Sequence, residues 1–254
     1  MDKYKRLAQK FTDREKIVAT TITLLKSPVL LECMYRESLD FLLFDTEHGI
    51  FDTEKLVDLL QICRLMELPS CVRVQDSEYH LIAKVIDMGA DGIMIPRVER
   101  MDQMKTAVDA LLFHPDGRKG IGGHGQFRKG EKFSEFKKTR FLLPQIESPK
   151  GIELLPEMLE RYGEYISAVI IGPNDLSIML GTPLDTKSPI VLKEIQKVFD
   201  ICNTYNKSCG IFCESENTAS TFRAMGCNVL WTGLDKDLFL RAYTGMMDAL
   251  DKVE

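Results

Sequence analysis

Eight short apolar runs alternate along the chain with segments of helical periodicity. The runs lie at about 17–24, 41–45, 70–74, 91–95, 141–146, 167–172, 209–213 and 228–232. Apolar residues at helical spacing occupy intervening segments at about 53–66, 81–88, 103–112, 151–159, 190–205 and 218–225. Strands that are buried on both faces of a parallel sheet have such continuous apolar runs. The alternation therefore predicts repeated strand–helix units around a parallel sheet.

The number of units favours a closed sheet. Eight strand–helix units in 254 residues match a (β/α)8 TIM barrel, which typically has about 250 residues. A doubly wound open sheet also accommodates the alternation, but its ligands gather at one switch point. We predict an α/β protein with one (β/α)8 barrel domain over residues 1–254. A glycine-rich loop at about 114–133 and a C-terminal helix at about 235–251 complete this prediction.

Polar residues follow several of the apolar runs at the point where each run ends. They comprise acids, a histidine, an arginine and amides: Asp45, Glu47, His48, Arg73, Gln145, Glu147, Pro173, Asn174 and Asp175, with Pro173 included as part of the last segment. A buried strand has polar neighbours only where it leaves the core. In a TIM barrel the carboxyl ends of the strands share one rim, which carries the catalytic residues. The sequence thus predicts an active site on that rim.

Composition and charge exclude several classes of partner. The net charge of -5 and the absence of a basic stripe with interleaved aromatics argue against nucleic acid and anionic membrane surfaces. No segment approaches the roughly 18 apolar residues of a membrane span, and the charged start of the chain does not resemble a signal peptide. Seven scattered cysteines without a Cys-x-x-Cys pair are typical of reduced core residues. We expect a cytoplasmic protein that acts on small molecules.

The stretch at 114–133 is rich in glycine and contains Gly120-Ile121-Gly122-Gly123-His124-Gly125, which satisfies G-x-G-x-x-G. That fingerprint binds dinucleotides only between a strand and a helix, and the preceding residues 115–119 are typical of a turn. Dinucleotide binding is therefore not expected. Long loops often act as lids or binding loops, so the stretch is either a substrate lid, in which His124 touches the substrate, or a mobile surface loop.

Six short motifs, in order, resemble those of a known family. They are Asp45-Thr46-Glu47-His48-Gly49, Val72-Arg73-Val74, the segment 89–96, Gly117-Arg118-Lys119-Gly120, Gln145-Ile146-Glu147-Ser148 and the segment 171–177. The chain resembles the HpcH/HpaI family of class II, metal-dependent pyruvate aldolases over about residues 15 to 240. Members include 2-keto-3-deoxy sugar acid and 4-hydroxy-2-oxo acid aldolases. The resemblance implies a (β/α)8 barrel that reversibly cleaves a 4-hydroxy-2-oxo acid into pyruvate and an aldehyde through a metal-stabilised enolate.

Glu147 and Asp175 are the candidate metal ligands. Carboxylate oxygens suit Mg²⁺ or Mn²⁺, with Co²⁺ as a further candidate, and the resemblance implies that these two carboxylates bind the ion. The alternative is that each caps a following helix. Arg73 lies in an apolar run, where an unpaired guanidinium is costly to bury. It either forms a structural ion pair with Glu47 or Asp45 or, as the resemblance implies, contacts the keto oxygen of pyruvate.

The remaining polar residues receive supporting roles. His48 is the expected general base, with Asp45 holding its tautomer, and the resemblance implies proton transfer at the aldehyde oxygen. Glu47 is expected near metal-bound water. Gln145 lies two residues before Glu147 and so on the same side of a strand, where it orients substrate or water. The segment Pro173-Asn174 is expected to bind substrate as well.

Several alternatives stay open. None of the apolar runs carries a lysine at its centre or end, so a Schiff-base mechanism is not favoured. A related barrel lyase acting on a CoA thioester or another keto acid, or a non-catalytic barrel, is the alternative function. The resemblance also implies a homo-oligomer, a hexamer built from dimers that exchange the C-terminal helix. The apolar stripe of that helix equally fits packing on its own barrel.

Overall fold

The computed structural model describes residues 2–253, and its sheet is a closed barrel of parallel strands in chain order. The strands are β1 (Ile17–Ile22), β2 (Phe41–Asp45), β3 (Ser70–Arg73), β4 (Gly92–Ile95), β5 (Phe141–Ile146), β6 (Ala168–Ile171), β7 (Ser208–Cys213) and β8 (Val229–Leu234). Each begins and ends within about two residues of a predicted run. The prediction of a (β/α)8 barrel is confirmed, and the open sheet is excluded because β1 pairs with β8.

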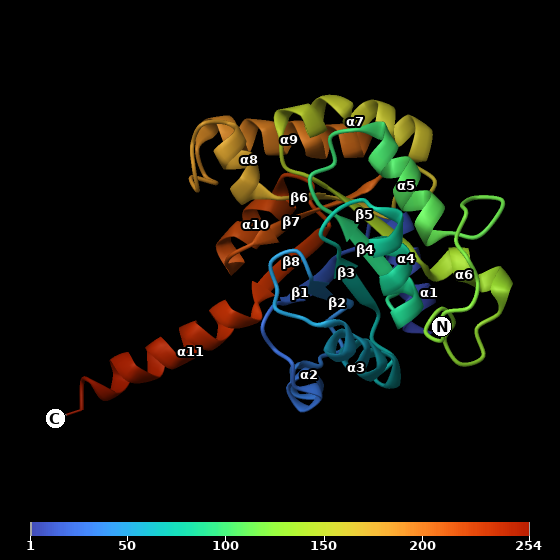
Figure 1. Ribbon diagram of the computed structural model, residues 1–254. Helices are drawn as coiled ribbons and strands as arrows, with labels where there is room; N and C mark the ends of the chain where they lie inside the picture. Colours follow the sequence, from blue (N-terminus) through green and yellow to red (C-terminus); the bar gives the residue numbers. More distant parts are fainter. Residues whose placement is uncertain (1, 254) are drawn as a thin grey trace.

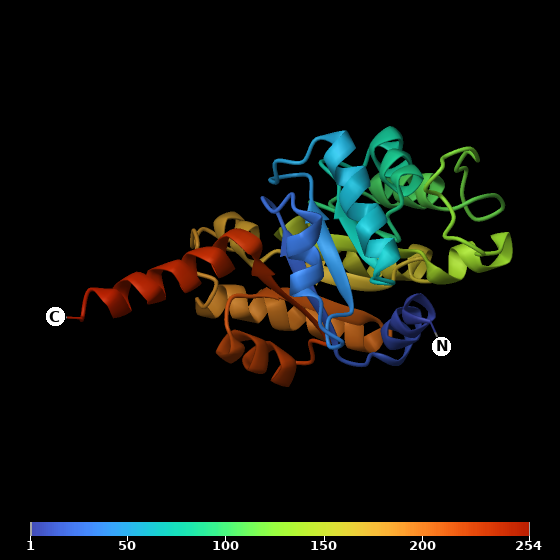
Figure 2. The ribbon, with the colours of Figure 1, turned by 90° about the horizontal axis from the view of Figure 1, so that it is seen from below.

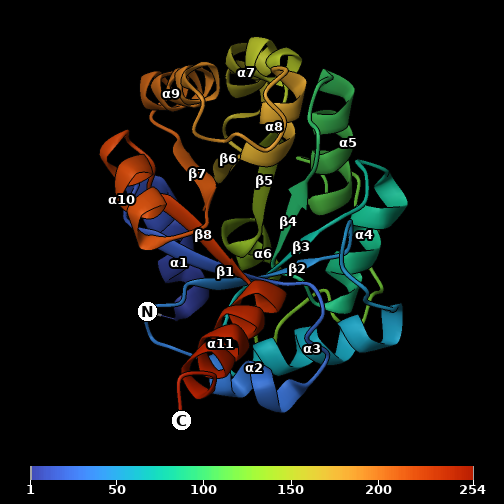
Figure 3. The same cartoon turned by 90° about the vertical axis from the view of Figure 1, so that its left-hand side faces the viewer.

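Helices surround this barrel, as Figure 1 and Figure 3 show. Within residues 2–253 they are α1 (Lys3–Asp13), α2 (Pro28–Met34), α3 (Thr53–Leu65), α4 (Tyr79–Met88), α5 (Met101–Leu111), α6 (Phe133–Thr139), α7 (Pro149–Tyr162), α8 (Pro173–Met179), α9 (Pro189–Thr204), α10 (Glu216–Ala224) and α11 (Asp235–Leu250). None of the helices in that described part of the chain is both long and apolar enough to cross a membrane.

Helix α1, which the apolar pattern did not predict, closes the amino-terminal end of the barrel. Asp2 caps it by accepting a hydrogen bond of 2.8 Å from the backbone N–H of Lys5. Its Phe11 ring lies 6.5 Å from that of Phe41 and 5.6 Å from that of Phe141, measured between centroids. These two residues begin β2 and β5. Phe11 therefore packs over the first residues of the strands.

The core has two layers, and successive strand residues alternate between them. Leu43, Cys71 and Leu143 belong to a buried cluster inside the barrel. Their neighbours, such as Leu42 and Phe44, belong to a larger cluster between the barrel and the helices. Side chains two positions apart on a strand point to the same side, so the residue two positions after each of these interior residues also points inward. These residues lie at the carboxyl ends of their strands.

The glycine-rich stretch lies at the amino-terminal end of the barrel. Arg128 forms an ion pair of 2.5 Å with Asp91, which immediately precedes β4, and its guanidinium stacks 3.9 Å from the ring centroid of Tyr4 in α1. Arg64, in the last turn of α3, donates to the carbonyl of Gly125. The lid interpretation is therefore wrong, and with it the expected contact between His124 and substrate. Those contacts fix the stretch at the end opposite the strand carboxyl termini.

The last helix, α11, projects from the barrel, as Figure 1 and Figure 2 show. Asp235 anchors its start, because its carboxylate accepts hydrogen bonds from the backbone N–H groups of Leu24 at 2.8 Å and Leu25 at 2.6 Å. Asp235 is the buried residue of the helix. The rest of α11 is thus held by its first turn and leaves apolar side chains exposed.

Candidate active site

Three side chains reach the barrel mouth because of the strand alternation. Asp45, Arg73 and Gln145 each lie two residues after an interior residue of β2, β3 or β5. Asp45 and Arg73 are also direct register partners on neighbouring strands. The sequence therefore places an acid, a guanidinium and an amide in one layer, directly above the apolar interior.

Two carboxylates pair with the Nε and Nη2 atoms of Arg73. Its Nε lies 2.9 Å from Oδ1 of Asp45 and its Nη2 lies 2.6 Å from Oδ2, a bidentate arrangement, and Glu47 is 3.4 Å from Nε. Arg73 is 8% exposed and Asp45 1%. Burial alone would lower the pKa of Arg73, but the hydrogen bonds to Asp45 raise it above its usual value. The guanidinium therefore stays charged. Its contact with Asp45 is the structural ion pair that was one of the two alternatives for Arg73 in the sequence analysis.

The partner predicted for Asp45 is wrong. Its carboxylate binds Arg73 and, through Oδ1, accepts from the backbone N–H groups of Glu47 at 3.1 Å and His48 at 3.3 Å. The carboxylate within ion-pair distance of the His48 imidazole is that of Glu47, at 3.8 Å from Nε2. Register brings Asp45 to Arg73, whereas the chain turns outward before His48, whose side chain is 64% exposed.

Glu147 lies behind Gln145 and is held by two donors. Gln145 Nε2 donates to Oε2 at 2.7 Å, and the backbone N–H of Arg97 donates to Oε1 at 2.8 Å. Gln145 Oε1 in turn accepts from Arg73 Nη1 at 3.4 Å. A chain of contacts thus joins Glu147 to Arg73, with Gln145 as the link.

Arg97 is a site residue that the sequence did not single out. It follows β4, has a left-handed backbone (φ 48°), and its guanidinium pairs with Glu47. This conformation presents its backbone N–H to Glu147 while its side chain reaches Glu47. Its place directly after Ile95-Pro96 at a strand end was the signal available in the sequence.

The environment of Glu147 favours a cation. Burial, followed by the nearby charges of Asp175 and Glu47, raises the pKa of Glu147 to about 7, and the hydrogen bond from Arg97 only partly opposes this. A Cβ atom at Gly172 would collide with Oε2 of Glu147, so glycine at this position lets the backbone after β6 approach the carboxylate without displacing it. Two carboxylates at neighbouring strand ends form a hard oxygen donor set.

Asp175 lies in the first turn of α8. The cap position of that helix is Gly172, and Pro173 occupies the first helical position. Asp175 is therefore not the cap residue, contrary to the alternative reading, although its charge near a helix N-terminus is favourable. Residues 2–253 contain no group of three or more His, Cys, Asp or Glu side chains arranged to hold a metal. The charge of Asp175 is close enough to raise the pKa of Glu147.

A cavity of about 280 Å³ opens onto these residues. Seven of the predicted site residues line it, namely Asp45, His48, Arg73, Gln145, Pro173, Asn174 and Asp175, and Glu47 and Glu147 adjoin it through the contacts above. The opposite wall, from Phe212, Trp231 and Lys236, was not predicted. The Trp231 ring centroid lies 5.9 Å from the Arg73 guanidinium carbon, and Trp231 belongs to the interior layer of β8.

The fold and this cleft define a (β/α)8 barrel protein with an arginine and several carboxylates gathered at the carboxyl ends of its strands. The model of the family described as HpcH/HpaI aldolase/citrate lyase matches residues 23–242. The chain belongs to this HpcH/HpaI family, as its motifs predicted.

Named relatives show what the chain is similar to. A 5-keto-4-deoxy-D-glucarate aldolase of Shigella dysenteriae is 27% identical over 232 residues, 90% of each chain. A hydroxypyruvate/pyruvate aldolase of Delftia acidovorans is 29% identical over 222 residues, 85% of this chain and 81% of the relative. The crystal structure of a HpcH/HpaI aldolase/citrate lyase family protein from Burkholderia cenocepacia superposes with a TM-score of 0.88 at 24% identity, covering 98% of this chain and 100% of the other.

Proposed function

We propose that the protein is a divalent-metal-dependent aldolase that reversibly cleaves a 4-hydroxy-2-oxo acid into pyruvate and an aldehyde. The observation that carries the proposal is a permanently charged Arg73 at the barrel mouth, linked through Gln145 to a pair of carboxylates. Pyruvate enolate is an anion, and its formation requires fixed positive charge at the developing oxygen. The relatives named as aldolases support the same reaction class.

Glu147 and Asp175 fit a divalent ion. Their oxygens are the hard donors that Mg²⁺ and Mn²⁺ prefer, with Co²⁺ as a further candidate. The raised pKa of Glu147 reflects a buried carboxylate that faces other acids, and a cation there would relieve that repulsion. When bound, the ion would supply further positive charge to stabilise the enolate. Gln145 and the backbone N–H of Arg97 hold Glu147 in place for this role.

Arg73 would orient the keto acid. Asp45 occupies Nε and Nη2, so the guanidinium plane is fixed. Nη1 makes only a long contact of 3.4 Å to Gln145 and is free to donate to the substrate oxygen. Because Asp45 also keeps the guanidinium charged, the positive charge needs no rearrangement as the enolate forms.

His48 would move the proton at the hydroxyl of the aldol. It lines the open side of the cleft, where an aldehyde enters, and its imidazole lies 3.8 Å from Glu47. When the imidazole accepts a proton, the Glu47 carboxylate stabilises the positive charge. Glu47 is in turn paired with Arg73 and Arg97, which fixes its position.

The test is proton–deuterium exchange at the methyl group of pyruvate in heavy water, followed by NMR. It requires only enolate formation, so the identity of the aldehyde does not matter. Exchange that appears with Mg²⁺ or Mn²⁺ and stops with EDTA is the expected result. Absence of exchange with every divalent metal would overturn the proposal.

A second candidate is a barrel lyase that acts on a CoA thioester or another keto acid, because the description of the family includes citrate lyase. Such an enzyme would fail the pyruvate test and instead exchange protons at an acyl-CoA or a different keto acid. A non-catalytic barrel is not favoured, because Arg73, Glu147 and Asp175 are all present.

We also propose that the protein is a homo-oligomer in which α11 packs on another copy, and that the assembly is a hexamer. The helix exposes Leu238, Phe239, Tyr243, Met246 and Leu250. Beside its first turns, an apolar hollow of about 790 Å³ is lined by residues that include Leu24, Leu30 and Met34. Apolar surface of this kind is a usual mark of protein–protein contact.

A further inference from the structure

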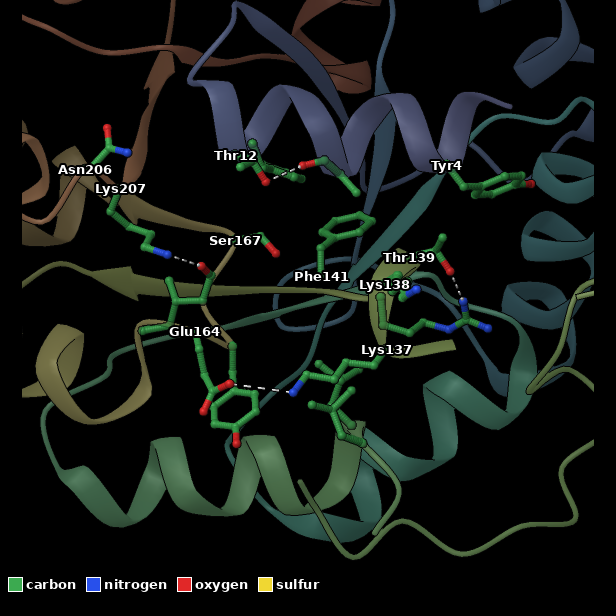
Figure 4. Close-up of a pocket in the computed structure, with 17 residues that line it drawn as sticks. Tyr4, Thr12, Lys137, Lys138, Thr139, Phe141, Glu164, Ser167, Asn206 and Lys207 are labelled. Carbon is green, nitrogen blue, oxygen red and sulfur yellow. Dashed lines mark hydrogen bonds and ion pairs between the residues drawn. The ribbon is translucent and has the colours of Figure 1, made fainter. Parts of the chain in front are cut away.

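A second cavity, of about 370 Å³, lies at the opposite end of the barrel from the cleft. Arg140, Ser167 and Lys207 line it, and each immediately precedes the first residue of a strand, β5, β6 or β7. Figure 4 shows side chains from α1, α6 and the segments before these strands around one hollow. Nothing in the aldolase proposal uses this cavity, although its volume is in the range of small-molecule sites.

The cavity is positively charged. Lys137, Lys138, Arg140 and Lys207 line it, with Glu164 as the acid. Lys137 pairs with Asp116 at 2.6 Å and lies 3.6 Å from Glu164, and Arg140 is paired with Glu131 at 2.9 Å. Within residues 2–253, neither Lys138 nor Lys207 forms a salt bridge, so two cations have no balancing acid there.

Lys207 is held in place without an anionic partner. Its Nζ donates to the carbonyl oxygens of Gly163 at 2.6 Å and Ile166 at 3.1 Å, which leaves one N–H unused. Burial lowers the pKa of Lys207. An ammonium that is partly desolvated and bound only to neutral carbonyls would gain from an anion nearby.

Further donors line the cavity. Within residues 2–253 the Ser167 hydroxyl and the Asn206 amide make no side-chain hydrogen bond, and Figure 4 shows both near Lys207. Arg140, which is 6% exposed, has a buried Nε atom with no partner in the described chain. The rings of Phe141 and Tyr165 also line the cavity, so it offers apolar surface to an organic body as well as donors to a charged group.

We propose that this cavity binds a small organic anion, through a carboxylate or phosphate group placed between Lys138, Lys207 and Ser167. Both groups are oxyanions, and lysine ammonium and hydroxyl donors recognise them by the same charge-assisted hydrogen bonds. The anion would also contact α1, α6 and the starts of β5 and β6, and so brace the end of the barrel that α1 closes. The site is separate from the cleft and does not depend on the aldolase proposal.

Isothermal titration calorimetry of the 254-residue protein tests this, with pyrophosphate and succinate as the two probes at constant ionic strength set with NaCl. Binding of either probe is expected, and the comparison tells phosphate from carboxylate preference. Lys138→Met should weaken binding about tenfold, the effect of one charge-assisted hydrogen bond. The matched control is Lys84→Met, because Lys84 is exposed on α4 and lines no described cavity; it should bind as the wild type does.

The cleft must be excluded as the source of binding. Arg73→Met removes the guanidinium of the cleft and should leave the affinity for the probe unchanged. Lys138 is exposed and its side chain forms no hydrogen bond or salt bridge within residues 2–253, so its variant should keep the wild-type melting temperature without ligand. The proposal is overturned if neither probe binds, or if Arg73→Met removes binding that Lys138→Met leaves intact.

Discussion

At the residue scale, Arg73 determines the charge of the cleft. It neutralises Asp45 directly and contacts Glu47 and Gln145, so it joins three of the polar side chains at the mouth. Breaking a buried ion pair leaves an uncompensated charge, which is costlier than losing the attraction itself. A substitution at Arg73 therefore changes both the chemistry and the arrangement of the neighbouring acids.

Arg73→Ala and His48→Ala should separate the two halves of the reaction. Arg73→Ala should lower the rate of pyruvate methyl exchange by about 10²–10³, because a preorganised donor to the enolate oxygen is lost. His48→Ala should spare most of that exchange but lower aldol cleavage by about 10²–10⁴, because it removes the proton carrier at the hydroxyl. Both rates are measured by NMR on the same preparations. Equal losses in the two assays for both variants would contradict this division of roles.

Glu147 should make the stability of the metal-free protein depend on pH. Its pKa in the folded protein is about 7, above the usual 4.5. Between these two pH values the native state therefore holds a proton that the unfolded chain has lost. This contribution to stability is fully present below about pH 4.5 and is lost as the pH rises through 7. A shift of this size corresponds to about 3 kcal/mol.

Glu147→Gln removes that titration and tests it. In EDTA, the free energy of unfolding of the variant should rise relative to that of the wild type as the pH increases from about 4.5 to 8. The change should reach about 3 kcal/mol. Urea denaturation at the two pH values measures the difference. Mn²⁺ at pH 8 should stabilise the wild type and not the variant, whereas Glu153→Gln, an exposed change on α7, should follow the wild type. If the difference in free energy of unfolding between the two proteins does not change with pH, Glu147 ionises like an exposed acid and the prediction is wrong.

At the element scale, a buried charge network attaches the glycine-rich stretch and α6 to the barrel. Glu131 binds Arg140 through both oxygens, at 2.9 and 3.0 Å, and also pairs with Arg128. Arg128 reaches Asp91 before β4. Burial alone would raise the pKa of Glu131, but the hydrogen bond from Arg140 and the charges of both arginines lower it. The carboxylate thus stays ionised between two guanidinium groups.

Glu131→Gln should destabilise the protein by about 3–5 kcal/mol at pH 7, because two largely buried arginines lose their shared anion. Urea denaturation followed by circular dichroism measures this. The matched control is Glu135→Gln, four residues further on, whose pair with Lys5 is exposed to solvent and should change the stability far less. Similar effects of the two changes would mean that the network does not hold this stretch.

The strands were predictable because each is a continuous apolar run, and the rim residues were predictable because polar groups end those runs. Helices α6 and α8 were not, because seven residues show too little periodicity. The partner of Asp45 was also beyond the sequence. Arg73 and His48 were both close candidates, and the choice between them depends on the β2–β3 register, which places Asp45 opposite Arg73.

At the scale of the whole molecule, the barrel separates two polar hollows. The cleft lies where β2, β3, β5 and β6 end, and the basic cavity lies where β5, β6 and β7 begin. The projecting α11 starts at the cleft side, since Lys236 in its first turn lines the cleft. A contact between the first turn of α11 and another copy would therefore lie next to the wall of the cleft that β8 forms.

The proposed assembly predicts a mass several times that of one chain. Size-exclusion chromatography with light scattering should give a hexamer for the wild type, the assembly that the family resemblance implies, in which the exposed apolar side chains of α11 would be covered by another copy. Phe239→Asp places a charge in that surface and should shift the protein to smaller species at the same concentration. Asp248→Asn, on the same helix, adds no charge to the apolar surface and should leave the mass unchanged. A wild type that elutes as a monomer would mean that α11 serves another purpose than joining copies of this chain.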